Sequence, residues 1–597
     1  MGKSEGKPNS KFSSFEALRR AAAGGDAQVP SEPEKPDEKG WVVETNEGEE
    51  MELTEEELAV LPRLDLGVPS RISGRPFAFG PMEHGPHPYQ DLDSDEMVVL
   101  RSFRVRTVFP DDVLAEVAGL PSDPRPEDIA GRLDLRDQLI FTIDGKDAQD
   151  FDDAIQIEPR EHGGYMIGVH IADVSHYVRE GTALDDEALA RGTSVYLADQ
   201  VIPMLPEGLS NNLCSLVPHR DRLAHTVFME FDATGERTSA KIHKSVIRSK
   251  FRCTYEGVQD LLDGKGTEAA AGLRELKSAL EQFSRWTRLQ QKIRDQKGSL
   301  RINSEEKKFV FDGVHEVKAV VLAPRYFSQA LIEETALAAN QAVGDSFRAR
   351  GLPTIYRVHP EKDPEEVEAV SKMLEKFGIR VPKKDRLTGR DIGRMIRLAR
   401  KRPNADALVQ RIMGLVERAV YEVKDHEDVA EHWGLARKAY LHFTSPIRRY
   451  PDLIVHRWLH ALESGEEGAE EALHSDALVA ELNATATHAS IQADMAQLAE
   501  TAIFDLKVCQ YMEPKIGEKL EAMVRNVNRY GIQVELVGLN VSGFLPIRSL
   551  GERPKVEGAT LTVRAGKRQL SFTEGYAIGI RVKEVDFLRL QVMLELA

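Results

Sequence analysis

The stretch DLRDQLIFTIDGKDAQDFDDAIQIEP, residues 134–159, constrains the fold more than any other part of the sequence. A strand-like run, LIFTI, ends at residue 143 and is followed by five aspartates: Asp144, Asp147, Asp150, Asp152 and Asp153. Side chains alternate along an extended chain, so Asp150 and Asp152 would face one way and Asp153 the other. These side chains can converge only if the backbone bends. We therefore predict a strand that delivers Asp144 and a bend in the backbone that brings the aspartates together.

The crowding of these carboxylates predicts a metal site. Carboxylates this close together repel one another unless cations hold them, and ligation by oxygen alone suits Mg²⁺, with Mn²⁺ as the alternative ion. We predict that Asp144, Asp150, Asp152 and Asp153 form this site. The spacing leaves two alternatives open, a solvated acidic turn and a calcium loop that only stabilises structure. The residue order of an EF-hand loop is absent.

Composition describes an ordinary globular chain. Of its 597 residues, 41% are hydrophobic and 29% are charged, and no apolar run approaches the ~18 residues of a membrane-spanning helix. The first 30 residues lack the apolar core of a secretory signal. Cys214, Cys253 and Cys509 lie far apart, which argues against disulfides and against a zinc site. We expect a cytoplasmic protein with no membrane partner.

The chain divides into four parts. Residues 1–65 carry 16 acidic and 8 basic side chains with few large apolar residues, so we predict a disordered acidic tail. Residues 66–125 read as a short lead-in with a strand-like run, MVVLRSFRV, at 97–105. Strand-like and helical patterns alternate over residues 126–512, which predicts a mixed α/β (α+β) body. Residues 513–597 read as five short strands, the number in a small all-β OB barrel.

Several long motifs, in one order, resemble those of the RNB exoribonuclease family, the RNase II and RNase R type. They are TIDGKDAQDFDDA (142–154), HIADVSHYV (170–178), RGTSVYLADQVIPMLPEGLSNNLCSL (191–216), ALIEETALAANQAV (330–343), YRVHP (356–360) and HFTSPIRRYPDLIVHR (442–457). The wording is nearer RNase R than RNase II. The resemblance implies that the four aspartates hold the catalytic magnesium. It also implies that Arg448 acts at the scissile phosphate, with Arg449 a weaker candidate, and the planar fork of arginine suits a phosphate.

The resemblance also implies a binding site for the 3′ end of RNA. Tyr196 matches the tyrosine that stacks on the terminal base, and Tyr255 aligns less closely with a second aromatic contact. Glu334 lies on the apolar stripe of a predicted helix, where a carboxylate is costly without a partner, and its family counterpart contacts the terminal sugar. Glu500 aligns loosely with another family glutamate. An ordinary core tyrosine at position 255 and a paired helical glutamate at position 500 remain alternatives.

The C-terminal segment is expected to hold RNA. Residues 515–597 carry 13 basic and 9 acidic side chains, although the whole chain has a net charge of −18. Arg529 and Tyr530, with Phe544, interleave basic and aromatic groups in the way that OB domains hold single strands. Phe544 as a core residue is the alternative.

Taken together, the motifs predict a Mg²⁺-dependent, processive 3′→5′ exoribonuclease that acts as a monomer on single-stranded 3′ ends and releases nucleoside 5′-monophosphates. One alternative is a catalytically inactive RNA-binding or regulatory relative, which the intact aspartates and Arg448 disfavour. Another is an endonuclease or DNase that uses the same metal site. The first 100 residues are too short for the two cold-shock-type barrels usual in this family, which leaves the degradation of duplexes open.

Overall fold

The computed structural model describes residues 94–597 except for 300–305, 313–315, 383–386, 403–404, 425–430, 433, 436, 465–467 and 558–559. It also describes a two-stranded hairpin, β1 (Trp41–Glu44) and β2 (Glu50–Leu53). The predicted disordered tail over residues 1–65 and the lead-in up to residue 93 otherwise lie outside the described residues.

A mixed seven-stranded sheet forms the centre of the molecule, in the order β11-β4-β5-β6-β9-β10-β3. Its strands are β3 (Leu133–Asp134), β4 (Phe141–Asp144), β5 (Asp153–Pro159), β6 (Tyr165–Ala172), β9 (Asp221–Phe231), β10 (Arg237–Arg248) and β11 (Phe251–Thr254). The pairs β4–β5–β6–β9–β10 are antiparallel, whereas β11 runs parallel to β4 and β3 runs parallel to β10. The predicted strand before the aspartates and the bend that follows it are confirmed, whereas β5 was not predicted from the sequence.

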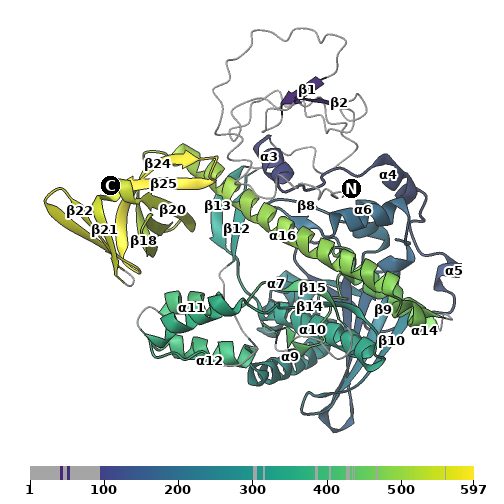
Figure 1. Ribbon diagram of the computed structural model, residues 1–597. Helices are drawn as coiled ribbons and strands as arrows, with labels where there is room; N and C mark the ends of the chain where they lie inside the picture. The colour runs from purple at the N-terminus through teal and green to yellow at the C-terminus, as the bar shows by residue number, and fades with distance from the viewer. Residues whose placement is uncertain are drawn as a thin grey trace, which may run out of the picture.

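Helices cover this sheet, as the mixed α/β prediction requires (Figure 1). They are α4 (Asp111–Ala118), α5 (Pro126–Ile129), α6 (Ala183–Arg191), α7 (Tyr255–Leu262), α8 (Glu268–Ala271), α9 (Lys277–Lys297), α10 (Phe327–Ala349), α14 (Tyr450–Ser464), α15 (Ala469–Leu473) and α16 (Asp476–Met512). Phe283 and Trp286 of α9 are fully buried, and Phe283 meets Phe141 of β4 edge to face. One hydrophobic core joins β4, β5, β6 and β9 to α9 and α10, and a second core lies around Ile140, Leu205 and Leu453.

Short strand pairs and a three-helix lobe extend from this body. The pairs are β7 (Val195–Tyr196) with β8 (Val201–Ile202), β12 (Lys307–Phe311) with β13 (Val317–Leu322), β14 (Thr354–Val358) with β15 (Val420–Lys424), and β16 (Glu431–His432) with β17 (Arg437–Lys438). The lobe comprises α11 (Pro364–Glu375), α12 (Gly389–Ala399) and α13 (Ala405–Met413), which share a core of their own. Because β14 and β15 pair with each other, they form a stem from which the lobe projects.

The strand-like interpretation of residues 97–105 is wrong, because α3 (Ser94–Ser102) occupies most of this run. Met97, Leu100 and Phe103 recur every three residues and are buried against α16, in a cluster that includes Ala499 and Ile503. A contiguous apolar run is compatible with a strand or a helix, and here the long partner helix decides between them. Among the polar contacts of α3 is a buried ion pair between Glu96 and Lys507.

The C-terminal part contains the predicted five-stranded barrel. The closed order is β18-β19-β20-β25-β24, with bounds β18 (Lys519–Asn528), β19 (Gly531–Leu536), β20 (Val541–Pro546), β24 (Ala577–Asp586) and β25 (Gln591–Leu596). A short helix, α17 (Ile547–Leu550), and a three-stranded sheet are inserted between β20 and β24. The sheet consists of β21 (Glu552–Glu557), β22 (Thr560–Ala565) and β23 (Arg568–Thr573), and the sequence analysis did not anticipate it.

Two further expectations concern the chemistry of the chain. The cysteines Cys214, Cys253 and Cys509 are all buried and free, in agreement with the expected absence of disulfides. In the part of the chain that the structure describes, none of the helices combines the length and the apolar character needed to cross a membrane.

Candidate active site

Two neighbouring strands deliver the ends of the aspartate run to one place. β4 ends at Asp144, β5 begins at Asp153, and the two strands are antiparallel neighbours in the central sheet. Asp150 and Asp152 lie on the loop 145–152, which connects these strands. The electrostatic neighbours of Asp144 include Asp150 and Asp153. The predicted bend therefore gathers carboxylates that an extended chain would separate.

Side chains from other parts of the chain hold this loop through hydrogen bonds to the loop backbone. Arg252 donates from Nη2 to the carbonyl oxygens of Gly145 at 2.7 Å and of Lys146 at 2.5 Å. Further along, the Ser215 hydroxyl accepts from the N–H of Phe151 at 2.9 Å and donates to the carbonyl of Gln149 at 2.6 Å. Buried backbone groups without partners would be costly, so these contacts favour a single loop conformation.

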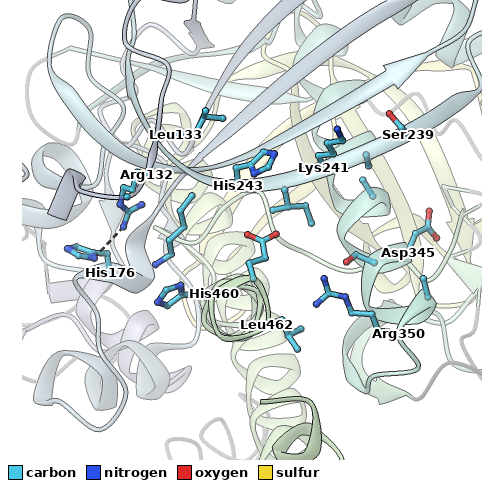
Figure 2. Close-up of a pocket in the computed structure, with 18 of the residues that line it drawn as sticks. Arg132, Leu133, His176, Ser239, Lys241, His243, Asp345, Arg350, His460 and Leu462 are labelled. Atoms are coloured by element: carbon cyan, nitrogen blue, oxygen red, sulfur yellow. Dashed lines mark hydrogen bonds between the residues drawn. The ribbon is translucent and has the colours of Figure 1, made fainter. Parts of the chain in front are cut away.

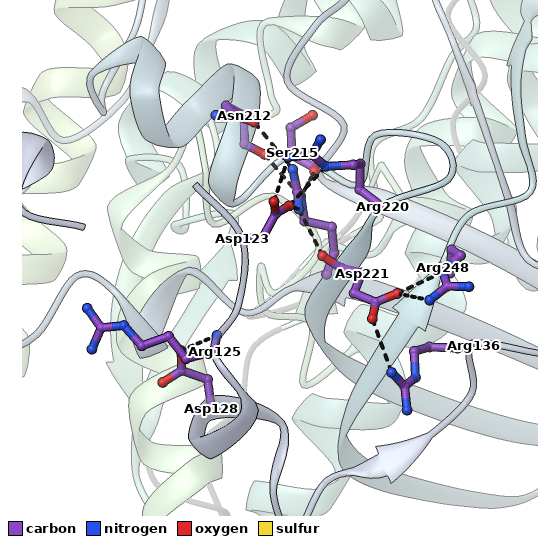
Figure 3. Close-up of polar contacts among 10 residues, drawn as sticks. Asp123, Arg125, Asp128, Arg136, Asn212, Ser215, Arg220, Asp221 and Arg248 are labelled. Carbon is purple, nitrogen blue, oxygen red and sulfur yellow. Dashed lines mark hydrogen bonds and ion pairs between the residues drawn. The ribbon is translucent and has the colours of Figure 1, made fainter. Parts of the chain in front are cut away.

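A buried arginine supports Ser215 from behind. Arg222 donates to the carbonyl oxygen of Ser215 at 3.0 Å and to Asp123 Oδ1 at 2.9 Å. Figure 3 shows Ser215 and Asn212 beside Asp123 and Arg220 in this network. Sequence reasoning missed these residues, although Ser215 lies inside one of the quoted motifs. The signal would have been a polar side chain in an otherwise apolar run.

Asp152 connects the loop to the arginine motif at the start of α14. The N–H of Ile447 donates to Asp152 Oδ1 at 2.9 Å, and Arg448 Nε lies 3.6 Å from Asp152 Oδ2. Arg448 also donates from Nη2 to Ser445 Oγ at 2.9 Å. The Arg448 side chain is 38% exposed, whereas that of Asp152 is 6% exposed. The guanidinium therefore faces the aspartates and remains open to a ligand.

Burial and mutual repulsion make these carboxyl groups reluctant to ionise. Burial, followed by the charges of Asp153 and Asp150, raises the pKa of Asp144 to about 8. Burial raises the pKa of Asp153 to about 6 and that of Asp152 well above its usual value, although Arg448 opposes both shifts. The pKa of Asp150 is raised by burial as well. Such shifts mark a site that a cation would stabilise in its ionised form.

The donor set fits a hard divalent cation. Asp144 Oδ2 and Asp152 Oδ2 are buried and have no hydrogen-bond partner among the described residues, so two oxygens are free for a metal. No three of the four aspartates bring carboxylate oxygens within 4.8 Å of one another. Mg²⁺ is commonly bound by only one or two carboxylates together with water and substrate phosphate, so this wider spacing suits it.

Arg448 and Arg449 have different surroundings. Arg449 donates from Nε and Nη2 to the two carboxylate oxygens of Asp452, at 2.9 and 2.7 Å, and its side chain is 17% exposed. Asp452 also accepts from the N–H of Ser445. The Arg449 fork is thus engaged within the protein, where it holds the turn that presents Arg448. Its assignment to substrate binding stays a prediction.

This difference predicts opposite consequences for two matched variants. Arg448→Gln is expected to lower kcat for RNA hydrolysis about 100-fold with little change in melting temperature, because an open donor is lost. Arg449→Gln is expected to lower the free energy of unfolding by roughly 3–5 kcal/mol, because Asp452 keeps a buried charge without its partner. Single-turnover rates and thermal melts of both variants test this. An unchanged rate for Arg448→Gln would contradict the role given to Arg448.

The predicted tyrosines and Glu500 lie around the aspartates. The N–H of Tyr196 donates to Glu500 Oε1 at 2.8 Å, which joins β7 to α16. Burial raises the pKa of the Tyr196 phenol, and the nearest charges include those of Arg448 and Asp150. The side chain is nevertheless 41% exposed, so its face is accessible. Tyr255 begins α7, and its electrostatic neighbours include Asp144. The structure therefore brings Tyr196, Tyr255 and Glu500 together.

Glu334 lies elsewhere. It is fully buried in α10, as its place on the apolar stripe predicted, and Glu333 is 43% exposed. The carboxylate of Glu334 forms an ion pair with Arg294 of α9 at 2.9 Å and is the principal charge acting on Arg437. A buried carboxylate requires a partner, and for Glu334 that partner lies on another helix. The contact of Glu334 with the terminal sugar remains a prediction.

The candidate RNA contacts of the barrel occupy an exposed turn between β18 and β19. Tyr530 is 61% exposed, and the Arg529 guanidinium stacks on its ring at 4.7 Å. Phe544 on β20 is partly exposed, and its ring lies over Gly531. These three residues form one basic and aromatic patch, as expected for a surface that stacks bases.

A second polar cluster, unanticipated from the sequence, lies deeper in the body. Asp173, His225 and His456 place ligand atoms within 4.8 Å of one another, and all three are fully or nearly fully buried. Asp173 also pairs with Arg132 at 2.7 Å and with Lys244 at 3.6 Å. Two cations already balance this carboxylate, so the cluster joins β6, β9, β10 and α14 and has little need of a metal.

Removing the Asp173 charge is expected to destabilise the fold. In Asp173→Asn, Arg132 and Lys244 would keep buried charges without compensation, at a cost of roughly 3–5 kcal/mol. Chemical denaturation measures this loss. The control Ser175→Ala removes only a hydroxyl that donates to Asp173, and it should cost no more than about 1.5 kcal/mol. Equal stability of both variants would contradict the assigned role.

A large cavity of about 1380 Å³ lies between β10, the second half of α10 and the end of α14 (Figure 2). Lys241 and His243, on β10, lie opposite Asp345 and Arg350 of the α10 region. None of the four aspartates, and neither Arg448 nor Tyr196, lines this cavity. The candidate active site therefore lies outside this cavity, and it is located by the chemistry of its side chains.

Comparison with known families identifies the class. The RNB domain family matches residues 132–465, and the S1 RNA binding domain family matches residues 513–585. The first match contains the four aspartates and Arg448, and the second coincides with the barrel. The chain therefore belongs to the RNB family of exoribonucleases.

Within this family, similar proteins are named ribonuclease R. The Thermotoga maritima protein is 37% identical over 504 residues, which cover 83% of this chain and 69% of the relative. The Escherichia coli protein is 34% identical over 508 residues, which cover 82% of this chain and 61% of the relative. This chain thus spans less than two thirds of the length of the second relative.

Solved structures agree on the fold. Mycoplasma genitalium RNase R in complex with ribose methylated single-stranded RNA matches with a TM-score of 0.72 at 24% identity, covering 85% of this chain and 78% of that one. Yeast Ssd1, a pseudonuclease, matches with a TM-score of 0.58 at 18% identity, covering 80% and 59%. At these identities the likeness shows the fold alone. Activity has to be argued from the site.

Proposed function

We propose that the protein is a Mg²⁺-dependent, processive 3′→5′ exoribonuclease that hydrolyses single-stranded RNA to nucleoside 5′-monophosphates. The observation that carries this proposal is the meeting of four buried or partly buried aspartates with an open arginine, Arg448. A surface that only bound RNA would need cations and aromatic rings, and it would gain nothing from carboxylates that repel phosphate. Family membership supports the same class of hydrolase.

The aspartates would hold the metal. Asp144 and Asp152 each offer a buried oxygen without a hydrogen-bond partner, and Asp150 and Asp153 lie beside them. Bound Mg²⁺ would supply an activated water and would neutralise negative charge on the phosphate. Mn²⁺ has the same ligand preference and is the expected substitute.

Arg448 would act on the scissile phosphate. Its guanidinium is pre-positioned by Ser445 and Asp152, so little reorganisation accompanies the increase of charge on the phosphoryl oxygens. Asp152 has a second role in this arrangement, because its Oδ1 accepts from the Ile447 N–H and fixes the turn that carries Arg448. Loop and arginine therefore keep their relative positions.

The residues around the aspartates suit a terminal nucleotide of any base. Tyr196 exposes an aromatic face, and stacking on such a face stabilises a base by roughly 1–3 kcal/mol whichever base it is. Glu500 orients the Tyr196 backbone. The barrel patch at Arg529 and Tyr530 would hold the strand further from the 3′ end. Two holds on one strand raise the effective concentration of the end, which supports processive action by a monomer.

The inactive alternative remains a real one for this fold, since Ssd1 is a pseudonuclease. What favours catalysis here is the complete set of acidic and basic groups and their contact at Asp152 and Arg448. An endonuclease on the same metal site would need a groove open at both sides of the aspartates. The stacking residue Tyr196, next to Arg448, favours a site that closes on a chain end.

The experiment that tests the proposal uses a single-stranded RNA labelled at its 5′ end, incubated with Mg²⁺. Stepwise shortening together with release of nucleoside 5′-monophosphates is expected. A circular RNA of the same sequence, which has no 3′ end, should remain intact, and so should the corresponding DNA. Internal fragments or cleavage of the circle would instead indicate an endonuclease. A duplex with a 3′ overhang shows how far structured RNA is degraded.

A further inference from the structure

The three-helix lobe carries a concentration of positive charge that contrasts with the rest of the chain. Residues 376–418 contain 13 lysines and arginines and 4 aspartates and glutamates, whereas the whole chain has a net charge of −18. The acidic side chains of the lobe gather on α11, where Lys372 pairs with Glu368 at 2.8 Å. The positive charge lies on α12 and on the turn that follows it.

The basic residues of α12 form one face. Arg390, Arg394 and Arg397 recur at intervals of four and three residues along α12, and all three are exposed, as is Lys401 on the turn that follows the helix. Positions with this spacing lie on one side of a helix. The opposite side contributes Ile392, Met395 and Ala399 to the core of the lobe. We call the exposed side the basic face of α12.

An ordinary solvated face does not account for this arrangement. Solvated helix faces intersperse charges of both signs, and like charges four residues apart destabilise a helix by a few tenths of a kcal/mol. Arg390 and Arg394 are such like-charged neighbours. Among the described residues, Arg394, Arg397 and Lys401 have no ion-pair partner. The one acidic residue of α12, Asp391, caps the helix by accepting from the N–H and the hydroxyl of Thr388, so a polyanionic partner would account for the exposed cations kept together on this face.

The stem connects this face to the active site. Tyr421 of β15 bonds through its hydroxyl to His442 Nδ1 at 2.8 Å, and His442 begins the motif that ends with Arg448 and Arg449. The charges of Arg449 and Arg448 act on Tyr421. The lobe is thus attached beside the arginine motif of the active site. In Figure 1, α11 and α12 lie on the same side of the molecule as the barrel.

We propose that the basic face of α12 binds the phosphate backbone of the RNA substrate, 5′ to the nucleotides held in the active site. This inference rests on the proposed function, because RNA is the polyanion that the active site would bind. Residues Arg394 and Arg397 contact phosphates, and Arg390 anchors the helix, since it donates from Nε to the carbonyl of Lys297 at 3.2 Å. Phosphate contacts carry no base specificity, in keeping with stacking at Tyr196.

The test is binding of a long single-stranded RNA by the full chain, measured by fluorescence anisotropy in EDTA so that cleavage plays no part. Arg394→Glu/Arg397→Glu should weaken binding about tenfold at low salt and should reduce the slope of log K against log salt by about 1.4, for two lost phosphate contacts. Binding of an RNA of about five nucleotides, which fills the active site alone, should not change. Arg394→Lys/Arg397→Lys should retain the binding of long RNA.

The structure offers a matched control. Arg274 and Lys277 are exposed at the start of α9, and Lys297, at the other end of this helix, touches Arg390. The 21-residue helix separates the two places by about 30 Å. Arg274→Glu/Lys277→Glu changes the net charge by the same amount and should leave binding unaltered. Equal losses in both double variants would reduce the effect to overall charge and overturn the inference.

The remaining outcomes also decide the matter. Unchanged binding of long RNA by Arg394→Glu/Arg397→Glu overturns the inference. It is also overturned if this double variant loses binding only to vesicles of anionic lipid and not to RNA. Wild-type protein that binds long RNA without degrading it in Mg²⁺ would sink the proposed function and leave the inference standing. Misfolding is a minor concern, because the substitutions place one glutamate four residues after Arg390 and another four residues before Lys401, a favourable spacing for ion pairs. Melting temperature verifies the fold.

Discussion

Asp152→Asn is expected to reduce RNA hydrolysis about a thousandfold or more while RNA binding persists. The amide keeps the shape of the side chain, and its oxygen can still accept from the N–H of Ile447, so the turn that carries Arg448 should stay in place. What is lost is the charge that faces Arg448 and the metal. Rates under single-turnover conditions and anisotropy with unlabelled competitor measure the two effects separately.

The same substitution should not weaken the fold. The pKa of Asp152 is raised by burial, so in the absence of a cation the ionised carboxylate opposes folding as pH rises above the unfolded pKa. A neutral amide removes this penalty, and the free energy of unfolding without Mg²⁺ should be equal to or higher than that of the wild type. Asp147→Asn is the matched control, because Asp147 is exposed on the same loop and should be dispensable. Equal inactivity of both variants would contradict the assignment.

Removal of divalent cations is expected to abolish hydrolysis, and added Mg²⁺ should restore it. The reason lies in the four crowded carboxylates, which repel one another and the phosphate unless a cation lies among them. Mn²⁺ should substitute, since both ions favour oxygen ligands. Full activity in excess EDTA would overturn the metal assignment.

A second readout does not depend on activity. An ion that binds only the folded state stabilises it by about 2.7 kcal/mol at a concentration 100 times its dissociation constant. Mg²⁺ should therefore raise the melting temperature of the wild type and of Asp147→Asn. It should have little effect on Asp144→Asn and Asp152→Asn, which lose the carboxylates whose Oδ2 atoms accept no hydrogen bond from the protein. If Mg²⁺ stabilises all four proteins equally, the ion binds elsewhere, and the Asp173–His225–His456 cluster is then the place to examine.

The sequence pattern predicted the structure correctly where the deciding interactions join residues that are close in the sequence. The run LIFTI followed by aspartates predicted β4 and the bent loop, because alternation and charge repulsion act over a few residues. The alternating C-terminal runs likewise predicted the five barrel strands. The placement of Glu334 on the buried face of its helix also followed from periodicity alone.

Contacts between residues that are distant in the sequence could not be predicted from local patterns. Glu334 pairs with Arg294, which lies 40 residues earlier on another helix, and nothing local to either residue indicates the pair. The helix α3 depends in the same way on α16, some 400 residues later. The difference between Arg448 and Arg449 could have been predicted from the sequence. Asp452 follows Arg449 by three residues, the spacing of a helical ion pair, and could have been recognised as its partner.

The helix α16 has a mechanical consequence for the last stages of degradation. Glu500 lies beside Tyr196 at one point of this helix, and Val508 and Met512, near its end, are packed into the barrel core. From Glu500 to Met512 the helix rises about 18 Å without a hinge. Under the proposed function, the helix fixes the separation between the barrel that holds the RNA and the site that shortens it. We therefore expect a remaining strand too short to span this length to lose one of its two holds and to dissociate, so that the helix and not the RNA sequence sets the size of the final fragment.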